Sequence, residues 1–352
     1  MPRLNNFDAM RIAAALAVIV GHGFELTGAG AAPRVLGVPI HVLGVQVFFV
    51  MSGFLITTSW LRTPSPLAFF RNRALRIFPG LVVVVLLTVF VLGPLVTTLS
   101  VPQYFAEPRT WRYLQNILLW PQFDLPGVFL NVPHPGSVNG SLWTLPVEFA
   151  CYIAVPVLLA FTRWRFAAVI AFAVAGVLID QFILNPLIVW GTSLQKGADL
   201  FTFFAAGMLV ALLGRRVLRL DIAIAALAAQ VLIAAAFNPI VSRWALWVTL
   251  SYVVLAFCMT STPYLRRAAR FGDLSYGLYI YAFPIQQLTV SAWPGLPFVA
   301  NLLVVITLTA GAAFASWHLV EKHALRLKAR PRSRTIAPLP AEGAAASMDH
   351  AH

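Results

Sequence analysis

Apolar residues run through this chain in long stretches that short, arginine-bearing polar segments separate. An α-helix needs about 20 apolar residues to cross the roughly 30 Å hydrocarbon core of a bilayer. The pattern predicts ten membrane-spanning helices. They cover residues 8–27, 42–61, 77–99, 141–161, 166–185, 198–214, 220–237, 243–262, 273–290 and 298–319.

Composition agrees with this pattern. Of the 352 residues, 60% are hydrophobic and only 11% are charged, which is far from the composition of a soluble domain. The net charge of +13 does not indicate nucleic-acid binding, because the basic residues recur in short clusters between apolar runs instead of forming one surface. We therefore predict an all-α polytopic membrane protein of about ten transmembrane helices, with lipid and not nucleic acid as its surroundings.

The basic residues also predict the orientation. Cytoplasmic loops carry an excess of Lys and Arg, and an N-terminus placed inside puts most of the 25 Lys and Arg on the inner side. The exceptions are Arg11, within the first helix, and five residues in the outer loops: Arg34, Arg109, Arg112, Lys196 and Arg243. Both termini are therefore expected in the cytoplasm.

Two further segments are predicted from composition. The longest outer connection, about 100–140, is rich in Pro, Asn and Trp, and we expect it to lie at the interface or cap a cavity. The stretch 329–352 has the composition of a disordered cytoplasmic tail. Residues 1–328 form the predicted transmembrane domain.

The first helix carries charged and polar residues that are costly in lipid. At 100° per residue, Asp8, Arg11, His22 and Glu25 fall within an arc of about 100°, so they form one stripe that faces other helices. Asp8 and Arg11 are also close enough along the helix to pair. The stripe either joins helices through buried hydrogen bonds or, as ionisable groups at membrane depth often do, carries function.

Five blocks of sequence resemble the acyltransferase family 3 membrane proteins, in the order that the family has them. Arg11 and His22, with ten residues between them, lie in "FDAMRIAAALAVIVGHGF". The later blocks are "GVQVFFVMSGFLIT" (44–57), "NGSLWTLPVEF" (139–149), "GDLSYGLYIYAFPIQQ" (272–287) and "SWHLVEKHALRLK" (316–328). Together they span nearly the whole chain.

The resemblance implies a membrane O-acyltransferase of the bacterial inner membrane. Such an enzyme transfers an acyl group, usually acetyl from acetyl-CoA, to a hydroxyl of a cell-envelope polysaccharide, its lipid-linked precursor or a related acceptor. It also implies Arg11 and His22 as the essential catalytic pair. Imidazole has an unperturbed pKa near neutrality, so His22 suits a general base. A transient acyl-imidazole on His22 is the other route, and both stay open.

Glu148 is the second catalytic candidate. The fourth predicted helix runs inward from about Ser141, so Glu148 is expected about 10 Å below the outer face, at a depth similar to that of His22. A carboxylate there would orient the imidazole or bind sugar hydroxyls. The alternative is a glutamate satisfied by Trp143 or Thr144.

The inner loop "FFRNRALRIFPG" (69–80) carries Arg71, Arg73 and Arg76. Positive-inside topology alone accounts for arginines in such a loop. The resemblance supports a second interpretation, because the family has an Arg-x-x-Arg pattern here. Arg73 and Arg76 would then present guanidinium groups to the phosphates of acetyl-CoA, with Arg71 beside them.

Further residues are predicted to support the catalytic pair. Asp8 would position the donor or the helix, and Ser275 and Tyr279 would line the site, although tyrosines at this spacing equally suit helix packing. His41 and His134 fall in outer loops and are expected at the surface. No metal site is predicted. A transporter or flippase is the alternative function, since intramembrane charges also mark substrate paths.

Overall fold

The helical content follows the apolar pattern. The computed structural model describes the whole chain except residues 1–4, 161, 184, 186 and 329–352. Within that part the chain is all-α apart from two short hairpins, β1 (Arg34–Val35) with β2 (Val38–Pro39) and β3 (Ile188–Val189) with β4 (Thr192–Ser193). The predicted fold class is confirmed. The predicted tail lies outside the described residues.

The long helices match the ten predicted segments. They are α1 (Phe7–Thr27), α2 (Ile40–Arg62), α3 (Pro66–Leu87), α7 (Thr144–Ala160), α8 (Arg165–Phe182), α9 (Leu194–Leu213), α10 (Leu220–Ala236), α11 (Pro239–Met259), α12 (Ser275–Ala292) and α13 (Phe298–Ser316). Two of them continue through π-turns: α3 through η1 (Thr88–Leu92) into α4 (Gly93–Val96), and α13 through η6 (Trp317–Glu321) into α14 (Lys322–Arg326).

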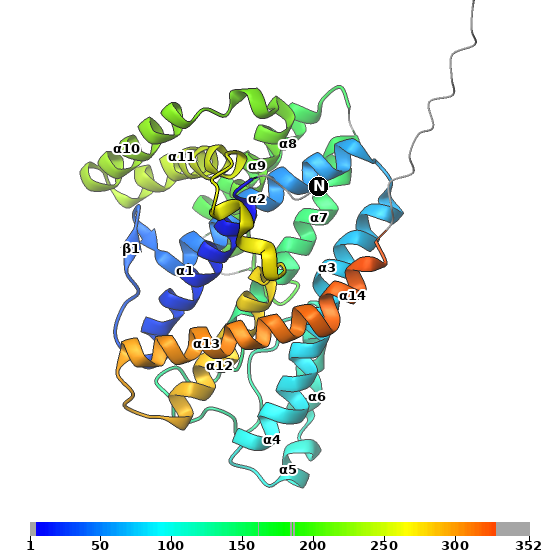
Figure 1. Ribbon diagram of the computed structural model, residues 1–352, viewed down its shortest axis with the longest axis vertical. Coiled ribbons are helices and arrows are strands. Elements are labelled where there is room, and N and C mark those ends of the chain that lie inside the picture. The colour runs from blue at the N-terminus through cyan, green and yellow to red at the C-terminus, as the bar shows by residue number, and fades with distance from the viewer. Residues whose placement is uncertain (1–4, 161, 184, 186, 329–352) are drawn as a thin grey trace, which may run out of the picture.

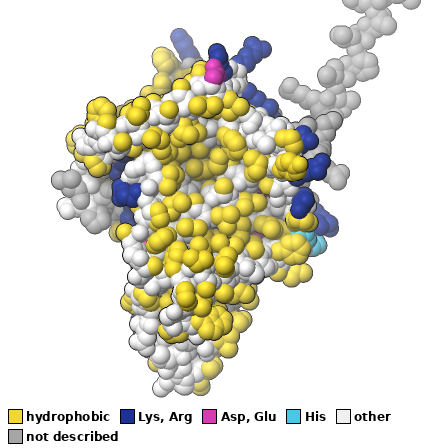
Figure 2. Space-filling model, turned by 60° about the vertical axis from the view of Figure 1, so that its left-hand side comes forward, with side chains coloured by type: hydrophobic (Ala, Val, Ile, Leu, Met, Phe, Trp, Pro, Cys, Tyr) yellow, Lys and Arg dark blue, Asp and Glu magenta, His cyan; other side chains and the backbone are white. Residues whose placement is uncertain are grey.

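Length and hydropathy set eight of these helices apart as membrane spans in the described part of the chain. The other two predicted spans are α10, which has only 17 residues, and α12, which is 18 residues long but carries more polar side chains. Apolar side chains on the outer face of α10, including Ile224 and Leu232, are exposed, as expected of a helix against lipid. Figure 2 shows such apolar side chains spread over one face of the molecule.

The arginine segment is helical, which the sequence pattern did not predict. The third span was expected to begin at residue 77, after a loop, but α3 begins at Pro66. Proline suits the first turn of a helix, where its missing N–H has no partner to lose. Arg73 and Arg76 are therefore held on a rigid helix and lie on one face of it.

Close helix packing depends on glycine. A Cβ on Gly53 in α2 would overlap the carbonyl oxygen of Phe204 in α9, and a Cβ on Gly207 in α9 would overlap the carbonyl oxygen of Val50. Small residues let helix backbones approach each other closely. Within a membrane, helix association depends on dispersion and hydrogen bonds because the hydrophobic effect does not drive it there. Helices α2 and α9 thus form a tightly packed pair.

This pair gives a first prediction. Gly53→Val should lower the thermal stability of the detergent-purified protein markedly, because the added atoms meet backbone that cannot move aside. Gly311→Ala is the matched control, since nothing lies within 4 Å of a Cβ at that position in α13. Thermal unfolding followed by light scattering would compare the two, and an equal melting temperature would contradict the packing described here.

The long outer connection folds into the bundle. It contains α5 (Val101–Ala106), α6 (Pro108–Arg112), η2 (Tyr113–Leu118) and, before α7, η3 (Gly140–Trp143). Helices α4, α5 and α6 lie together at the bottom of Figure 1. Between η2 and η3 the chain is irregular and partly buried, with Phe129 and Val138 in the core. Gln287 of α12 donates to the carbonyls of His134 and Ser137, at 2.8 and 2.7 Å, which ties this segment down.

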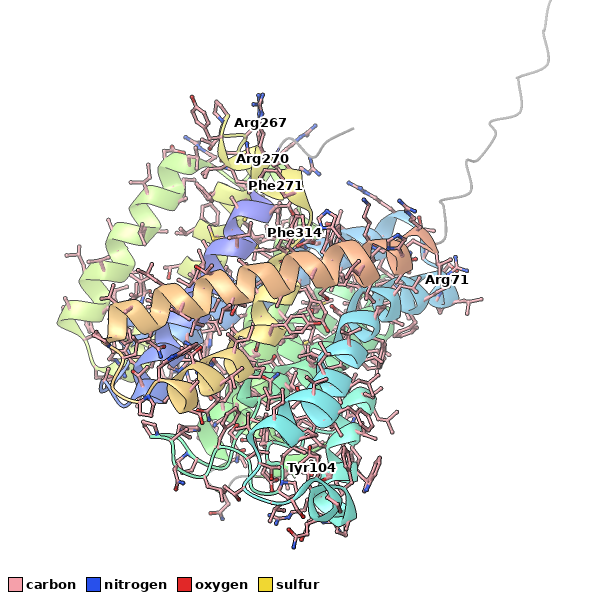
Figure 3. All side chains as sticks on the ribbon, turned by 60° about the horizontal axis from the view of Figure 1, so that its bottom comes forward. Arg71, Tyr104, Arg267, Arg270, Phe271 and Phe314 are labelled. Atoms are coloured by element: carbon pink, nitrogen blue, oxygen red, sulfur yellow. The ribbon has the colours of Figure 1, made fainter. Side chains whose placement is uncertain are left out.

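Basic side chains gather away from these outer helices. Figure 3 shows Arg267 and Arg270, from η5 (Leu265–Phe271), and Arg71 at the edges of the molecule remote from Tyr104 of α5. This separation agrees with the predicted orientation, in which the arginine-rich end faces the cytoplasm. The location of the termini stays a prediction. We call the arginine-rich end the inner end and the opposite end the outer end.

Candidate functional site

Helix α1 carries the polar stripe that its sequence predicts, and the two ends of the stripe belong to different clusters. Helix α1 packs against α2, α12 and α13. Near its start, Arg11 Nη1 lies 3.5 Å from Asp8 Oδ1 and 3.4 Å from Asp273 Oδ2. His22 is eleven residues further along, about 16 Å up the helix. The stripe therefore joins an inner and an outer cluster.

The inner cluster centres on Asp273, in the turn before α12. Arg76 Nη2 approaches Asp273 Oδ2 to 2.9 Å, and the Ser275 hydroxyl donates to Asp273 Oδ1 at 2.7 Å. Burial alone would raise the pKa of the Asp273 carboxyl, but Arg76 and Arg11 outweigh it, and the pKa lies well below its ordinary value. Asp273 thus stays ionised and holds α1, α3 and α12 together.

Arg76 has a second carboxylate partner. Its Nη1 lies 3.8 Å from Glu321 Oε2, and its guanidinium lies over the ring of Tyr276 at 5.6 Å. Glu321 in η6 is only 2% exposed and also accepts from Ser316 at 2.9 Å. A buried carboxylate needs such partners, so Arg76 is anchored by two charges, one in the turn before α12 and one in η6.

Arg73 is held differently. Its guanidinium lies 6.0 Å from the ring centres of Phe69 and of Tyr152 in α7, and Nε is buried without a hydrogen-bond partner in the described structure. Arg71, two residues earlier, is exposed on the other side of α3 and lines neither of the two inner cavities described below. The structure thus separates Arg71 from Arg73 and Arg76, with which the sequence grouped it.

Glu148 lies with these arginines and not with His22. Its Oε1 accepts from the Tyr152 hydroxyl at 2.5 Å, and the side chain lines a cavity together with Arg73 and Arg76. The expectation that Glu148 and His22 share a depth is therefore wrong. The reason is that the outer segment before α7 enters the helix bundle. Asn139 of this segment is buried and donates to the carbonyl of Ile280 in α12. Helix α7 therefore begins deeper in the bundle than its sequence suggests.

Two cavities lie in this inner region. The larger, about 1090 Å³, is lined by Asp8, Arg11 and Asp273 and by further basic residues. The smaller, about 110 Å³, lies deeper and is bounded by Glu148, Ser275 and Tyr279 among others. The residues that line both are Arg11, Leu55, Arg73 and Arg76. The arginines therefore stand where the two cavities meet.

Tyr279 separates the smaller cavity from the outer cluster. Its hydroxyl is 2.7 Å from Thr144 Oγ1 and donates to the carbonyl of Ser141 at 3.1 Å. Its ring meets that of Phe48 edge-on, with centres 5.9 Å apart. One turn further along α12 is Phe283, which contacts His22. Tyr279 thus stands on the path between the arginines and His22.

The outer cluster joins His22 to Glu25 and His41. His22 Nδ1 is 3.8 Å from Glu25 Oε2, and His41 Nε2 is 3.5 Å from Glu25 Oε1. The two imidazole rings stack with centres 4.9 Å apart, and Phe283 meets His22 edge-on at 5.4 Å. His41 is only 15% exposed, so the expectation of a surface histidine is wrong.

Glycine makes room for this stacking. A Cβ on Gly21 would lie 2.6 Å from His41 Cβ and 2.7 Å from His41 Nδ1. The β-hairpin of β1 and β2, which connects α1 to α2, brings the start of α2 back to the end of α1. No spacing rule within one helix relates His22 to His41, so sequence analysis missed their contact. The residues Asp273 and Glu321 were also missed, although both lie in the blocks of family resemblance.

Comparisons with known proteins agree with this arrangement. The family model described as an acyltransferase domain matches residues 4–321. The chain is 31% identical over 335 residues to the O-acetyl transferase of Shigella phage Sf6, covering 92% of this chain and 97% of that protein. It is 30% identical over 368 residues to nodulation protein 10 of Rhizobium leguminosarum bv. viciae, covering 92% and 94%.

A more distant relative is the peptidoglycan O-acetyltransferase OatA of Listeria monocytogenes serovar 1/2a. It is 29% identical over 174 residues, which are 45% of this chain and 25% of OatA. No solved structure matches the chain. The family match over nearly the whole chain, and relatives named as O-acetyltransferases, support the acyltransferase and not the alternative of a transporter or flippase. The protein is an integral membrane acyltransferase, and it belongs to acyltransferase family 3.

Proposed function

We propose that this enzyme transfers an acetyl group from acetyl-CoA to a hydroxyl of a cell-envelope saccharide, across the bacterial inner membrane. Acetyl-CoA would enter the larger cavity from the cytoplasm, and the saccharide would approach His22 from the outer side. The single observation that carries this proposal is the arginine-lined cavity at the inner end of α1, which continues into a smaller cavity toward His22.

The larger cavity suits the nucleotide end of the donor. Guanidinium groups bind phosphate through paired hydrogen bonds, and Arg62, Arg73 and Arg76 face this space together with Arg215. The buried, unpartnered Nε of Arg73 is a donor for which a ligand would supply the acceptor. A volume of about 1090 Å³ also accommodates a ligand larger than most metabolites.

The smaller cavity would guide the pantetheine arm. Arg11 and His22 are about 16 Å apart along α1, and hydroxyls of Ser52, Thr144 and Tyr279 lie between these levels. A long, narrow arm carrying the thioester would pass them, with a shift of the Phe48–Tyr279 contact at the upper end. Glu148 would act here, on the donor side, and not as a partner of the imidazole.

His22 would carry the proton chemistry. With Nδ1 directed toward Glu25, Nε2 is left for the acceptor. As base, His22 takes the hydroxyl proton while the acceptor oxygen bonds to the thioester carbonyl carbon. The carbon–sulfur bond then breaks, and the thiolate of coenzyme A takes up that proton. In the other route the acetyl group rests on His22 before it reaches the acceptor. Glu25 orients the imidazole in both.

The names of the relatives support the acceptor class. The phage protein is named an O-acetyl transferase and the Listeria protein a peptidoglycan O-acetyltransferase. Glu25 and His22 are 41% and 20% exposed, so a bulky, hydrated saccharide could reach them. We therefore propose a polysaccharide or a lipid-linked saccharide as acceptor, bound from the outer side.

The test uses membrane vesicles that contain the full-length protein. Inside-out vesicles, which expose the cytoplasmic face, would receive radiolabelled acetyl-CoA, and label would be followed into the envelope glycan fraction. We expect label in inside-out vesicles and none in sealed right-side-out vesicles until a detergent admits the donor. Equal labelling of both sealed preparations would contradict donor entry from the inner side, and no labelling in either would contradict acetyl transfer.

A further inference from the structure

We propose that His22, Glu25 and His41 form a binding site for a zinc ion, and that zinc bound there blocks transfer by occupying His22. The first half of this proposal rests on geometry alone, whereas the second half rests on the proposed function. The three residues come from two helices, and their ligand atoms all lie within 4.8 Å of one another.

The distances approach those of a real zinc site. Tetrahedral zinc binds nitrogen and oxygen at about 2.0–2.2 Å, which places neighbouring ligand atoms about 3.3–3.5 Å apart. His41 Nε2 to Glu25 Oε1 is 3.5 Å, and His22 Nδ1 to Glu25 Oε2 is 3.8 Å. Small rotations of two side chains would close the remaining gap between the imidazoles.

The ligand set also suits zinc. Two histidines and one glutamate are the protein ligands of several zinc enzymes, which leave a fourth position to water. Imidazole nitrogen and carboxylate oxygen favour zinc over magnesium and calcium, which prefer oxygen ligands alone. The site carries one negative charge when both imidazoles are neutral, so a divalent cation is favoured electrostatically.

The surroundings make the site accessible but ordered. Glu25 is 41% exposed, so an ion can arrive from the outer side. Gly21 admits His41, and Phe283 backs the His22 ring, which limits the positions that the two imidazoles can take. His41 Nδ1 has no hydrogen-bond partner, and a metal-bound histidine usually donates its second N–H. We therefore expect micromolar, reversible binding and not a permanent structural ion.

Occupancy of the site and catalysis exclude each other. A zinc ion on His22 takes a lone pair of the ring and fixes the imidazole through Glu25, the residue that we propose orients it. Neither proton abstraction nor acyl transfer to the ring is then available as proposed. Zinc at the outer side would thus switch the transferase off without touching the donor cavity.

Binding is measured first, without any activity assay. Full-length protein in detergent, with His350 and His352 replaced by glutamine to remove the histidines at the end of the chain, is titrated with zinc sulfate by calorimetry. We expect one equivalent bound, and at least about tenfold weaker binding in His22→Gln, Glu25→Gln and His41→Gln. His318→Gln, in η6 near the other end of the molecule, is the control and should bind as the parent does. Unchanged affinity in the three ligand variants would overturn the site.

Activity is the second measurement. Zinc should inhibit transfer by the parent protein near the dissociation constant from calorimetry, and a chelator should restore it. In His41→Gln, inhibition measured relative to that variant's own rate without zinc should need at least about tenfold more zinc. Full activity with zinc bound would overturn the blocking role. A protein without transfer that still binds zinc through these residues would count against the proposed function while supporting the metal site.

Discussion

Replacing Arg76 by alanine should abolish acetyl transfer and lower the stability of the protein. Arg76 lies 2.9 Å from Asp273 and 3.8 Å from Glu321, and Glu321 is almost fully buried. Removing one partner of a buried ion pair costs about 3–5 kcal/mol, because the remaining charge is left without compensation. The same change removes a guanidinium from the junction of the two cavities, so acetyl-CoA binding should also be lost.

Calorimetry with coenzyme A and thermal unfolding in detergent would measure both effects. Arg71→Ala is the matched control, since Arg71 lies on the same helix but is exposed and outside the cavities. It should leave binding and stability unchanged. Arg76→Lys keeps one charge without the planar fork and should recover stability better than donor binding. Equal losses in the Arg71 and Arg76 variants would mean that general positive charge, and not this cluster, binds the donor.

Replacing His22 by glutamine should reduce the turnover number by about 10²–10⁴-fold, the usual contribution of a general base. The KM for acetyl-CoA should stay within a few-fold, because His22 belongs to the outer cluster and not to the wall of the donor cavity. Glutamine keeps a polar side chain of similar size beside Glu25, so folding should be preserved. Steady-state transfer with purified protein would measure both constants.

A second histidine serves as the control for His22. His134→Gln changes an exposed imidazole near the same Phe283 ring, 6.3 Å between ring centres, and should retain activity. A rapid-quench experiment without acceptor then separates the two chemical routes. Label on the wild-type protein that His22→Gln lacks would favour the acyl-imidazole, and its absence would favour direct transfer. If His22→Gln turned over at the wild-type rate, His22 would not be catalytic, and the polar stripe on α1 would have a structural role.

Sequence analysis could find a contact in the site when the two residues lie close together in the chain, and could not find it otherwise. The pairing of Asp8 with Arg11 follows from helical spacing, and the structure confirms it. The shared face of Arg73 and Arg76 became clear only when the segment before residue 77 proved to be helical. The neighbours of Glu148 could not be predicted from helical spacing. Its depth depends on how far the outer segment before α7 enters the bundle, and no local pattern encodes that.

The pattern of residues along the chain was enough to predict the fold class, the approximate positions of the spans and the family. Burying backbone polar groups in lipid leaves helices as the solution for apolar runs of about 20 residues, so the ends of most helices agree with the prediction within a few residues. The five ordered blocks identified the family before any contact was known. The resemblance also implies Arg11 and His22 as the catalytic pair, and this role stays a prediction.

Which charged residues contact one another becomes visible only in the folded protein. Asp273 holds Arg11 and Arg76 across three segments that are far apart in the chain. His41 reaches His22 because a hairpin returns α2 to the end of α1 and Gly21 leaves space for the ring. Such contacts depend on the three-dimensional path of the chain and on close packing between helices. A hydropathy pattern describes one helix at a time, so it contains no information on the path of the chain or on packing between helices.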